Sequence, residues 1–287
     1  MDAVADANAA PATSNARRRI WLCADDYGIS PAVSGAIRDL VTRGRINATS
    51  VLVAAPSFDR DEAAKLRDVA LKRTAVGLHV TLTAPFAPLS QNFAPLRDGA
   101  FLSLAATLRR AHLRALRPKL LTVEISRQFE AFVVAFGRPP DFVDGHHHVH
   151  LFPQIRDAVL RVTKDLAPHA WVRQCGQLSA RRRLTDHKAL LLDGLSRRFR
   201  RLAADHGLRT NPAFAGTYTF RSDAAYARLF ATFLDRMPDG GVIMCHPGKV
   251  DAELKRLDHV TDAREHEYAF FGSDAFAHLL ATHGVTL

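Results

Sequence analysis

The stretch Arg19–Ala24, RIWLCA, is a short apolar run that leads directly into Asp25-Asp26-Tyr27-Gly28. An apolar run of this length, bounded by turn-forming residues, is typical of a buried strand. Ser30 and Pro31 follow, and these residue types are favoured as the N-cap and the first residue of a helix. We therefore expect a strand, a polar turn and then a helix that extends to about Arg43.

The same order of strand, loop and helix recurs along the chain. Further strands are expected at Ala48–Ala55, Ala75–Leu82, Phe142–His148, Ala170–Cys175, Ala213–Phe220 and Gly241–Cys245. Helices are expected at Asp59–Lys72, Leu120–Phe136, Pro153–Leu166, Arg181–Gly207, Ser222–Met237, Asp262–Phe271 and Ser273–His283. This alternation implies βαβ units and a mainly parallel sheet, and about seven such units favour a barrel. The expected fold class is therefore α/β, a single-domain and closed or nearly closed (β/α) barrel.

The chain has 287 residues, of which 47% are apolar and 24% charged, as is ordinary for one large folded domain. These values exclude a disordered chain, a collagen and a coiled coil. Residues 1–17 are predicted to be a disordered tail, and residues 18–287 the barrel domain, with a proline-containing insertion around 85–118. The tail lacks the pattern of a secretory signal, so the expected location is the cytoplasm, with peripheral contact at the inner membrane as a variant.

The overall charge is basic, with 39 Lys and Arg against 29 Asp and Glu. Such a balance permits an anionic membrane, nucleic acid or an acidic substrate as partner, and it selects none of them. The three cysteines, Cys23, Cys175 and Cys245, are widely spaced. Their number and spacing argue against a disulfide framework and agree with a reducing compartment.

Polar clusters lie where four of the predicted strands end. They are Asp25-Asp26, His79, the segment Asp144–His150, and His246. The carboxyl ends of parallel strands carry the active site in α/β folds, so we expect these side chains to lie together. Each cluster alone also has a structural explanation, because Asp is common in turns and a single His in an apolar strand is often a packed residue.

The His cluster strengthens the functional interpretation, since four His within five residues is unusual and His is a common metal ligand. If the segment is a strand, His146, His148 and His150 face one side and His147 the other. Asp and His side chains from three strands would form a site with open positions, which suits Zn²⁺ or another divalent ion.

The order of these motifs resembles the YdjC-like carbohydrate deacetylase family, which includes chitooligosaccharide deacetylases and a hopanoid-biosynthesis branch. The resemblance spans Arg18 to Phe271. The motifs that carry it are Ala24–Gly28, Gly77-Leu78-His79, Asp144–Pro153 and His246-Pro247-Gly248.

This resemblance implies a (β/α) barrel that is often distorted, and members of the family can be homodimers. It implies one divalent ion, Zn²⁺ or Mg²⁺, held by Asp26, His79 and His146. Asp25 resembles the general base. We assign the general acid to His246, with His148 as a competing candidate. The residues predicted to bind substrate or support the site are Tyr27, His148 and His150.

Two basic segments, 109–119 and 181–201, alternate arginines with leucines. They are interpreted either as solvated helix faces or as a surface for anionic lipid. The second interpretation slightly favours a lipid-linked sugar, such as a glycosylated hopanoid, over a soluble chitooligosaccharide.

The expected reaction is metal-dependent hydrolysis of an N-acetyl group on an amino sugar, with release of acetate. One alternative is another metal-dependent barrel hydrolase, acting on a phosphoester or a cyclic amide. A second alternative is a basic protein that binds membranes or nucleic acid, which would leave the Asp and His clusters unexplained. No nucleic-acid partner is therefore expected, and the sequence lacks a phosphate loop, a GxSxG elbow and a dinucleotide fingerprint.

Overall fold

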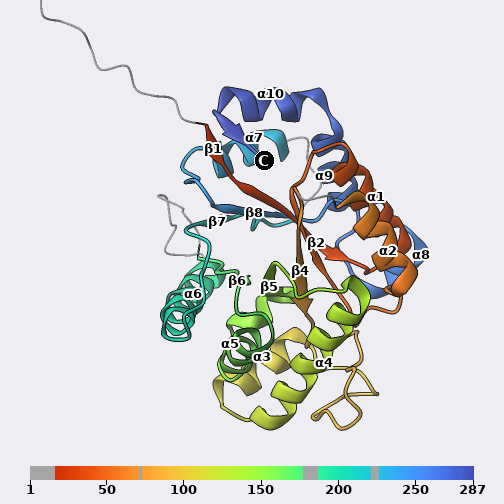
Figure 1. Ribbon diagram of the computed structural model, residues 1–287, viewed down its shortest axis with the longest axis vertical. Helices are drawn as coiled ribbons and strands as arrows, with labels where there is room; N and C mark the ends of the chain where they lie inside the picture. The colour runs from red at the N-terminus through yellow and green to blue at the C-terminus, as the bar shows by residue number, and fades with distance from the viewer. Residues whose placement is uncertain (1–16, 71–72, 177–186, 221–225) are drawn as a thin grey trace, which may run out of the picture.

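The computed structural model describes residues 17–70, 73–176, 187–220 and 226–287, and its centre is a curled sheet of seven parallel strands (Figure 1). The strand order is β6-β5-β4-β3-β2-β8-β7. The strands are β2 (Trp21–Tyr27), β3 (Ala48–Val51), β4 (Ala75–Val80), β5 (Phe142–Gly145), β6 (Trp171–Val172), β7 (Phe214–Ala215) and β8 (Val242–Cys245). The predicted α/β class with parallel strands is therefore confirmed.

The two edge strands of this sheet, β6 and β7, are linked through the residues that precede β7. Val172 forms an isolated parallel bridge with Thr210, and its N–H donates to the Arg209 carbonyl at 2.9 Å. The Asn211 side chain extends this seam by accepting from the Gln174 N–H and donating to the Gln174 carbonyl. The sheet thus curls into a distorted, nearly closed barrel.

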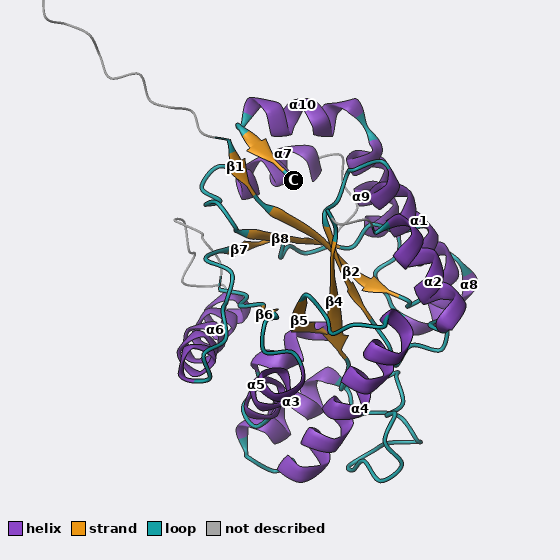
Figure 2. Cartoon of the chain, in the orientation of Figure 1, coloured by secondary structure: helices purple, strands orange, loops and turns teal. Residues whose placement is uncertain are grey.

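Helices cover the outside of the sheet (Figure 2). They are α1 (Pro31–Thr42), α2 (Arg60–Val69), α3 (Leu104–His112), α4 (Pro118–Phe136), α5 (Ile155–Leu166), α6 (His187–Asp205), α7 (Tyr226–Leu234), α8 (Ala252–Leu257), α9 (Asp262–Gly272) and α10 (Asp274–Thr282). Helix α1 begins as expected, because Ser30 Oγ accepts from the Val33 N–H and Pro31 opens the helix. Helix α4 ends at Gly137, whose φ of 69° suits the left-handed cap that glycine favours.

The segment after β5 differs most from its prediction. His146–Leu151 is a 3-10 helix, not the end of a strand, and His147 and His148 have φ values of 56° and 58°. The expected alternation of the His side chains across a strand is therefore wrong. The structure also adds α8 and a short parallel pair that the sequence did not predict, formed by β1 (Arg18–Arg19) and β9 (Val285–Thr286).

The barrel interior is layered along the strands. At the amino ends, Trp21 lies near Trp171, which stacks on Phe142 with ring centroids 4.5 Å apart. At the carboxyl ends, Asp25 and His79 are buried in polar contacts. Because alternate residues of a strand share a face, β2 presents Trp21 and Asp25 to the same interior at different depths. We call the carboxyl-end opening the upper mouth and the amino-end opening the lower mouth.

The basic helix α6 packs as an ordinary amphipathic helix. Leu192, Leu195 and Phe199 are buried in the core, while Arg197 and Arg198 are exposed. Core packing thus accounts for these buried residues, while Leu191 of α6 and Leu113 of the other basic segment are exposed, so a lipid-facing surface stays a prediction. Residues 181–186 of this basic segment, and the predicted tail except Arg17, lie outside the described residues. Among the described helices, none is long and apolar enough to cross a membrane.

Candidate active site

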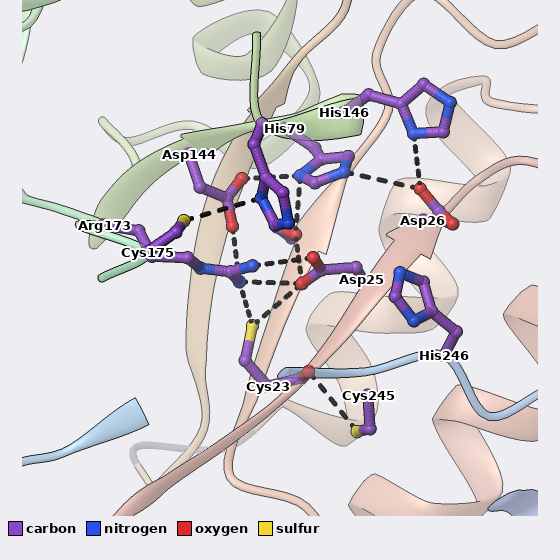
Figure 3. A network of polar contacts seen from close by, with 12 residues as sticks. Cys23, Asp25, Asp26, His79, Asp144, His146, Arg173, Cys175, Cys245 and His246 are labelled. Atoms are coloured by element: carbon purple, nitrogen blue, oxygen red, sulfur yellow. Dashed lines mark hydrogen bonds and ion pairs between the residues drawn. The ribbon is translucent and has the colours of Figure 1, made fainter. Parts of the chain in front are cut away.

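The two adjacent aspartates occupy an irregular end of β2. The register between β2 and β3 shifts between Ala24 and Tyr27, and Asp26 has a φ of 67°. A bulge of this kind re-aims side chains at a strand end. As a result Asp25 faces Arg173 across the barrel, whereas Asp26 faces His146 (Figure 3).

Three predicted metal ligands meet at the upper mouth. Asp26 Oδ1 lies 2.9 Å from His146 Nδ1 and 3.4 Å from His79 Nε2. One ligand atom from each of the three residues lies within 4.8 Å of the others, and all three residues are buried. His79 Nδ1 contacts Asp144 Oδ1 at 2.6 Å on its other side, an arrangement that fixes the ring of a ligating His.

Arg173, which directly follows β6 and faces Asp25, was not predicted as a site residue. Its guanidinium binds both oxygens of Asp25, at 2.6 and 2.7 Å, and Asp144 Oδ2 at 2.5 Å. Cys23, Asp25 and Asp144 could by proximity form a second metal group, but this guanidinium already lies among them. The sequence held one signal for Arg173, the single charged residue in the predicted strand Ala170–Cys175.

The Arg173 guanidinium sets the charge state of Asp25. Burial alone would raise the pKa of Asp25, but Arg173, His79 and His246 together outweigh it and hold this pKa well below its usual range. Asp25 Oδ1 also accepts from Ser50 Oγ at 3.1 Å. Asp25 is therefore an ionised, firmly oriented carboxylate.

A second buried arginine, Arg264 of α9, binds the other aspartate. Its Nη2 lies 2.6 Å from Asp26 Oδ2 and 2.5 Å from Asp258 Oδ2. Arg264 leaves Asp26 Oδ1 turned toward the His pair. Nothing in the helical pattern of 262–271 indicated this contact, because one arginine among several charged residues of a helix carries no distinguishing signal.

His246 lies beside the metal-ligand group, directly after β8. Its backbone N–H donates to Glu267, which also accepts from the Tyr218 hydroxyl at 2.6 Å. Among the described residues, His246 Nδ1 has no hydrogen-bond partner. Burial lowers the pKa of His246, although the carboxylate of Asp26 partly opposes this effect.

These groups line one cavity of about 320 Å³ at the upper mouth. Asp25, Asp26, His79, His146 and His246 all contribute to its surface, as do His147 and His148 from the 3-10 segment. Leu104 of the insertion and Phe220 supply apolar surface. The predicted catalytic and metal-binding residues are thus brought to a single opening.

The remaining predicted residues differ in their positions. His148 lines the cavity, with its Nδ1 3.5 Å from Cys175 Sγ. His150 is not among the residues that line the cavity, and it donates from Nε2 to the Arg173 carbonyl at 2.8 Å, so its contact supports the backbone that carries Arg173. Tyr27 is outside the lining, and its hydroxyl donates to Glu62 at 2.6 Å.

The charge around the three-residue group suits a divalent cation. Four carboxylates, from Asp25, Asp26, Asp144 and Asp258, surround two guanidinium groups. The carboxylates therefore outnumber the guanidinium groups. Burial lowers the pKa of His79, but the negative charges of Asp144 and Asp25 outweigh this effect and raise that pKa to about 10. The oxygen and imidazole donors at Asp26, His79 and His146 fit Zn²⁺ or another divalent ion.

Comparison with known proteins places this chain in a family. The chain matches the family described as YdjC-like protein over residues 19–282. It is 31% identical to the chitooligosaccharide deacetylase of Citrobacter koseri over 244 residues, which cover 83% of this chain and 85% of that protein. It is 36% identical to the chitooligosaccharide deacetylase of Proteus mirabilis over 134 residues, 46% of this chain and 50% of that protein. The chain belongs to the YdjC-like family.

The fold also has a solved counterpart. A crystal structure of an Enterococcus faecalis V583 protein, described as a cellobiose-phosphate cleavage protein, aligns with a TM-score of 0.72. The alignment covers 94% of this chain and 97% of that chain at 21% sequence identity. At this identity the likeness concerns the fold, and it agrees with the single α/β barrel.

Proposed function

We propose that this protein removes the N-acetyl group from an acetylamino sugar, with one divalent metal ion bound by Asp26, His79 and His146. One observation carries the proposal. Three ligand atoms converge within 4.8 Å at a cavity that also exposes a carboxylate, Asp25, and an imidazole, His246. The chitooligosaccharide deacetylases among the relatives support the substrate class.

Asp25 acts as the general base in this proposal. A bound divalent ion polarises the amide carbonyl and acidifies water. Asp25, kept ionised by Arg173, accepts the proton of the attacking water while the water oxygen bonds to the acetyl carbon. A carboxylate with a strongly lowered pKa is a weak base, so the transfer to Asp25 would depend on the lowered water pKa that a bound ion would supply.

His246 serves the second half of the reaction. The C–N bond breaks, and the leaving nitrogen of the sugar needs a proton. His246 Nδ1 has no hydrogen-bond partner in the described part of the chain, so it is available for this transfer. Because burial lowers the pKa of His246, the resting ring is neutral near pH 7. The proton that Asp25 accepts from the water would pass to His246 and from its ring to the leaving nitrogen.

The cavity limits the size of the buried substrate. Its volume of about 320 Å³ is at the low end of ligand pockets, which span about 300–1,000 Å³. We infer that one acetylamino ring is enclosed and that the rest of the acceptor lies outside. Leu192 and Leu195 of α6 pack inward and Leu191 is exposed, so the arginine and leucine pattern of this helix does not by itself select a lipid-linked or a soluble acceptor.

The test is acetate release by the full chain from N-acetylglucosamine oligomers and from a lipid-linked acetylamino sugar. We expect release to stop after chelation and to return when Zn²⁺ or Mg²⁺ is added. His79→Ala should lose bound metal and activity together, whereas the surface variant Arg97→Glu should lose neither. Undiminished release from protein shown to be metal-free would refute the metal site. Phosphoester or cyclic-amide hydrolysis without acetate release would favour the alternative hydrolase.

A further inference from the structure

A second, larger cavity opens at the lower mouth, at the opposite end of the strands from Asp25. Its volume is about 620 Å³. Its lining includes Trp21, Ala75 and Trp171, the first residues of β2, β4 and β6. Because these strands are parallel, the cavity is separated from the metal-ligand group by the length of the barrel. The proposed deacetylation makes no use of it.

Arginine dominates the rim of this lower cavity. Arg19, Arg73, Arg138 and Arg209 line it, and Asp141 is the carboxylate among the lining residues. Arg138 binds both oxygens of Asp141, at 2.8 and 2.9 Å, which neutralises this carboxylate. The other three guanidinium groups leave the rim positively charged. Arginine presents several N–H donors in a planar fork that matches phosphate oxygens.

The floor of the cavity is aromatic. The rings of Trp21 and Trp171 lie with centroids 6.4 Å apart, and both side chains are partly exposed. Phe142 supports Trp171 from the interior side by stacking on it. The Arg19 guanidinium lies 5.0 Å from the centre of the Trp21 ring, so one positive group is held directly beside the aromatic floor. A flat ring placed against the indoles would have its charged substituent within reach of the arginines.

We propose that the lower mouth is a binding site for a phosphorylated ligand that carries a ring with a face able to pack on an indole, the chemistry shared by nucleotides and sugar phosphates. Guanidinium groups at the rim bind the phosphate, and the indole floor packs against the ring. A phosphate without a ring satisfies only the rim. An uncharged ring satisfies only the floor. Tight binding therefore needs both parts in one molecule.

The composition of the chain provides a direct readout. The protein has two tryptophans, Trp21 and Trp171, and both lie on this floor. Intrinsic tryptophan fluorescence therefore reports on the lower mouth. The full chain would be titrated with adenosine diphosphate, glucose 6-phosphate and inorganic phosphate, and with adenosine and glucose as uncharged controls. Excitation at the red edge of the indole band avoids absorption by adenine.

We expect a saturable fluorescence change with adenosine diphosphate or glucose 6-phosphate, and weaker binding of inorganic phosphate and of the uncharged compounds. The probe that binds more tightly, adenosine diphosphate or glucose 6-phosphate, shows whether the ligand is a nucleotide or a sugar phosphate. Arg73→Glu and Arg209→Glu should each weaken binding about tenfold, since each replaces a charge-assisted contact with repulsion. Arg97→Glu, a charge reversal at a side chain 85% exposed on the insertion, is the matched control and should bind as wild type.

Three results would overturn the proposal. The first is an absence of any saturable change with the ring-bearing phosphates. The second is binding of inorganic phosphate as tight as theirs, which would leave the aromatic floor without a role. The third is equal binding by the wild type, Arg73→Glu and Arg209→Glu. An N-acetylglucosamine oligomer, the probe for the upper mouth, should leave the fluorescence unchanged, so failure here is distinguishable from failure of the deacetylase assignment.

Discussion

The two mouths of the barrel are built from the same strands but hold their charges in different ways. Strand β2 contributes Trp21 to the lower mouth and Asp25 to the upper mouth. In the upper mouth, the charged groups are buried and bind one another, as Arg173 binds Asp25. In the lower mouth, arginines such as Arg73 are exposed at the rim and the partly exposed floor is aromatic.

Because of this difference, charge substitutions should affect the stability of the fold differently at the two mouths. A buried charge that loses its partner is strongly destabilising, because water cannot replace the lost contact. An exposed arginine can be replaced at little cost in stability, because it is solvated in both states. Substitution of a charged residue at the upper mouth should therefore destabilise the fold, whereas substitution of an arginine at the lower mouth should change stability little.

The largest expected effect is on turnover at the upper mouth. Asp25→Asn removes the proposed base, and a well-placed proton acceptor contributes about 10²–10⁴-fold to the rate. We expect acetate release to fall by that factor while the bound metal, measured by elemental analysis, is retained. Asp98→Asn, at a carboxylate 92% exposed on the insertion, should keep full turnover. Wild-type turnover by Asp25→Asn would show that another group takes the proton.

The next effect compares one arginine from each mouth. Arg173→Met leaves Asp25 and Asp144 buried without their guanidinium, so the free energy of unfolding should fall by about 3–5 kcal/mol. Arg73→Met should change it by less than about 0.5 kcal/mol. Urea denaturation of both variants measures the difference. Equal losses for the two variants would remove the contrast between buried and exposed charge.

A third effect concerns pH and the support of His246. Burial raises the pKa of Glu267 to about 7 from its usual 4.5, so its protonated form is favoured in the folded state. A raised pKa contributes stability below about pH 4.5, and this contribution is lost as the pH rises through about 7. The Gln side chain of Glu267→Gln cannot ionise, so the variant should keep the free energy of unfolding that the wild type loses as the pH rises, up to about 3 kcal/mol.

The measurement is the free energy of unfolding of wild type and Glu267→Gln between pH 5 and 9. We expect the wild type to lose stability relative to the variant as the pH rises. A constant difference between the two proteins would mean that Glu267 does not titrate in this interval.

The barrel was predictable from sequence because its signals are local. The apolar run at Arg19–Ala24, the Ser30-Pro31 helix start and the Gly137 stop each depend on neighbouring residues. The 3-10 segment at 146–151 was mistaken for a strand, since its His residues carry no strong local preference and its left-handed residues are not glycines. The pairing of β1 with β9 was missed because it joins the two ends of the described chain.

The site was predicted in the same uneven way. Asp26 and His79 lie near the ends of β2 and β4, and His146 directly follows β5, so the rule that parallel strands end at one edge was enough to bring them together. Arg173 and Arg264 escaped because an ion pair across the barrel depends on side-chain reach and depth, which strand spacing does not encode. The lower cavity escaped as well, since its arginines come from loops and strand starts spread over the chain.

The smallest expected effect tests the layer between the two mouths. Gly77 lies in β4, and a Cβ there would stand 2.4 Å from Phe142 Cε2, too close for the ring to keep its position. Gly77→Ala should therefore cost about 1–3 kcal/mol, the usual range for overpacking a core. Because Phe142 stacks on Trp171, the displaced ring should also alter the tryptophan fluorescence.

Gly35→Ala provides the matched control for this last substitution. Gly35 lies in α1, and the nearest atom to its added Cβ is Arg38 Nη2 at 3.8 Å, which is ordinary contact. Alanine is the better helix former, so this variant should gain about 0.5–1 kcal/mol and keep the wild-type fluorescence. Acetate release separates the two possible routes of strain in Gly77→Ala. If the Phe142 ring moves toward the lower mouth, the tryptophan fluorescence should change while acetate release stays at the wild-type rate. A large loss of acetate release with unchanged fluorescence would show that the strain reaches the upper mouth instead.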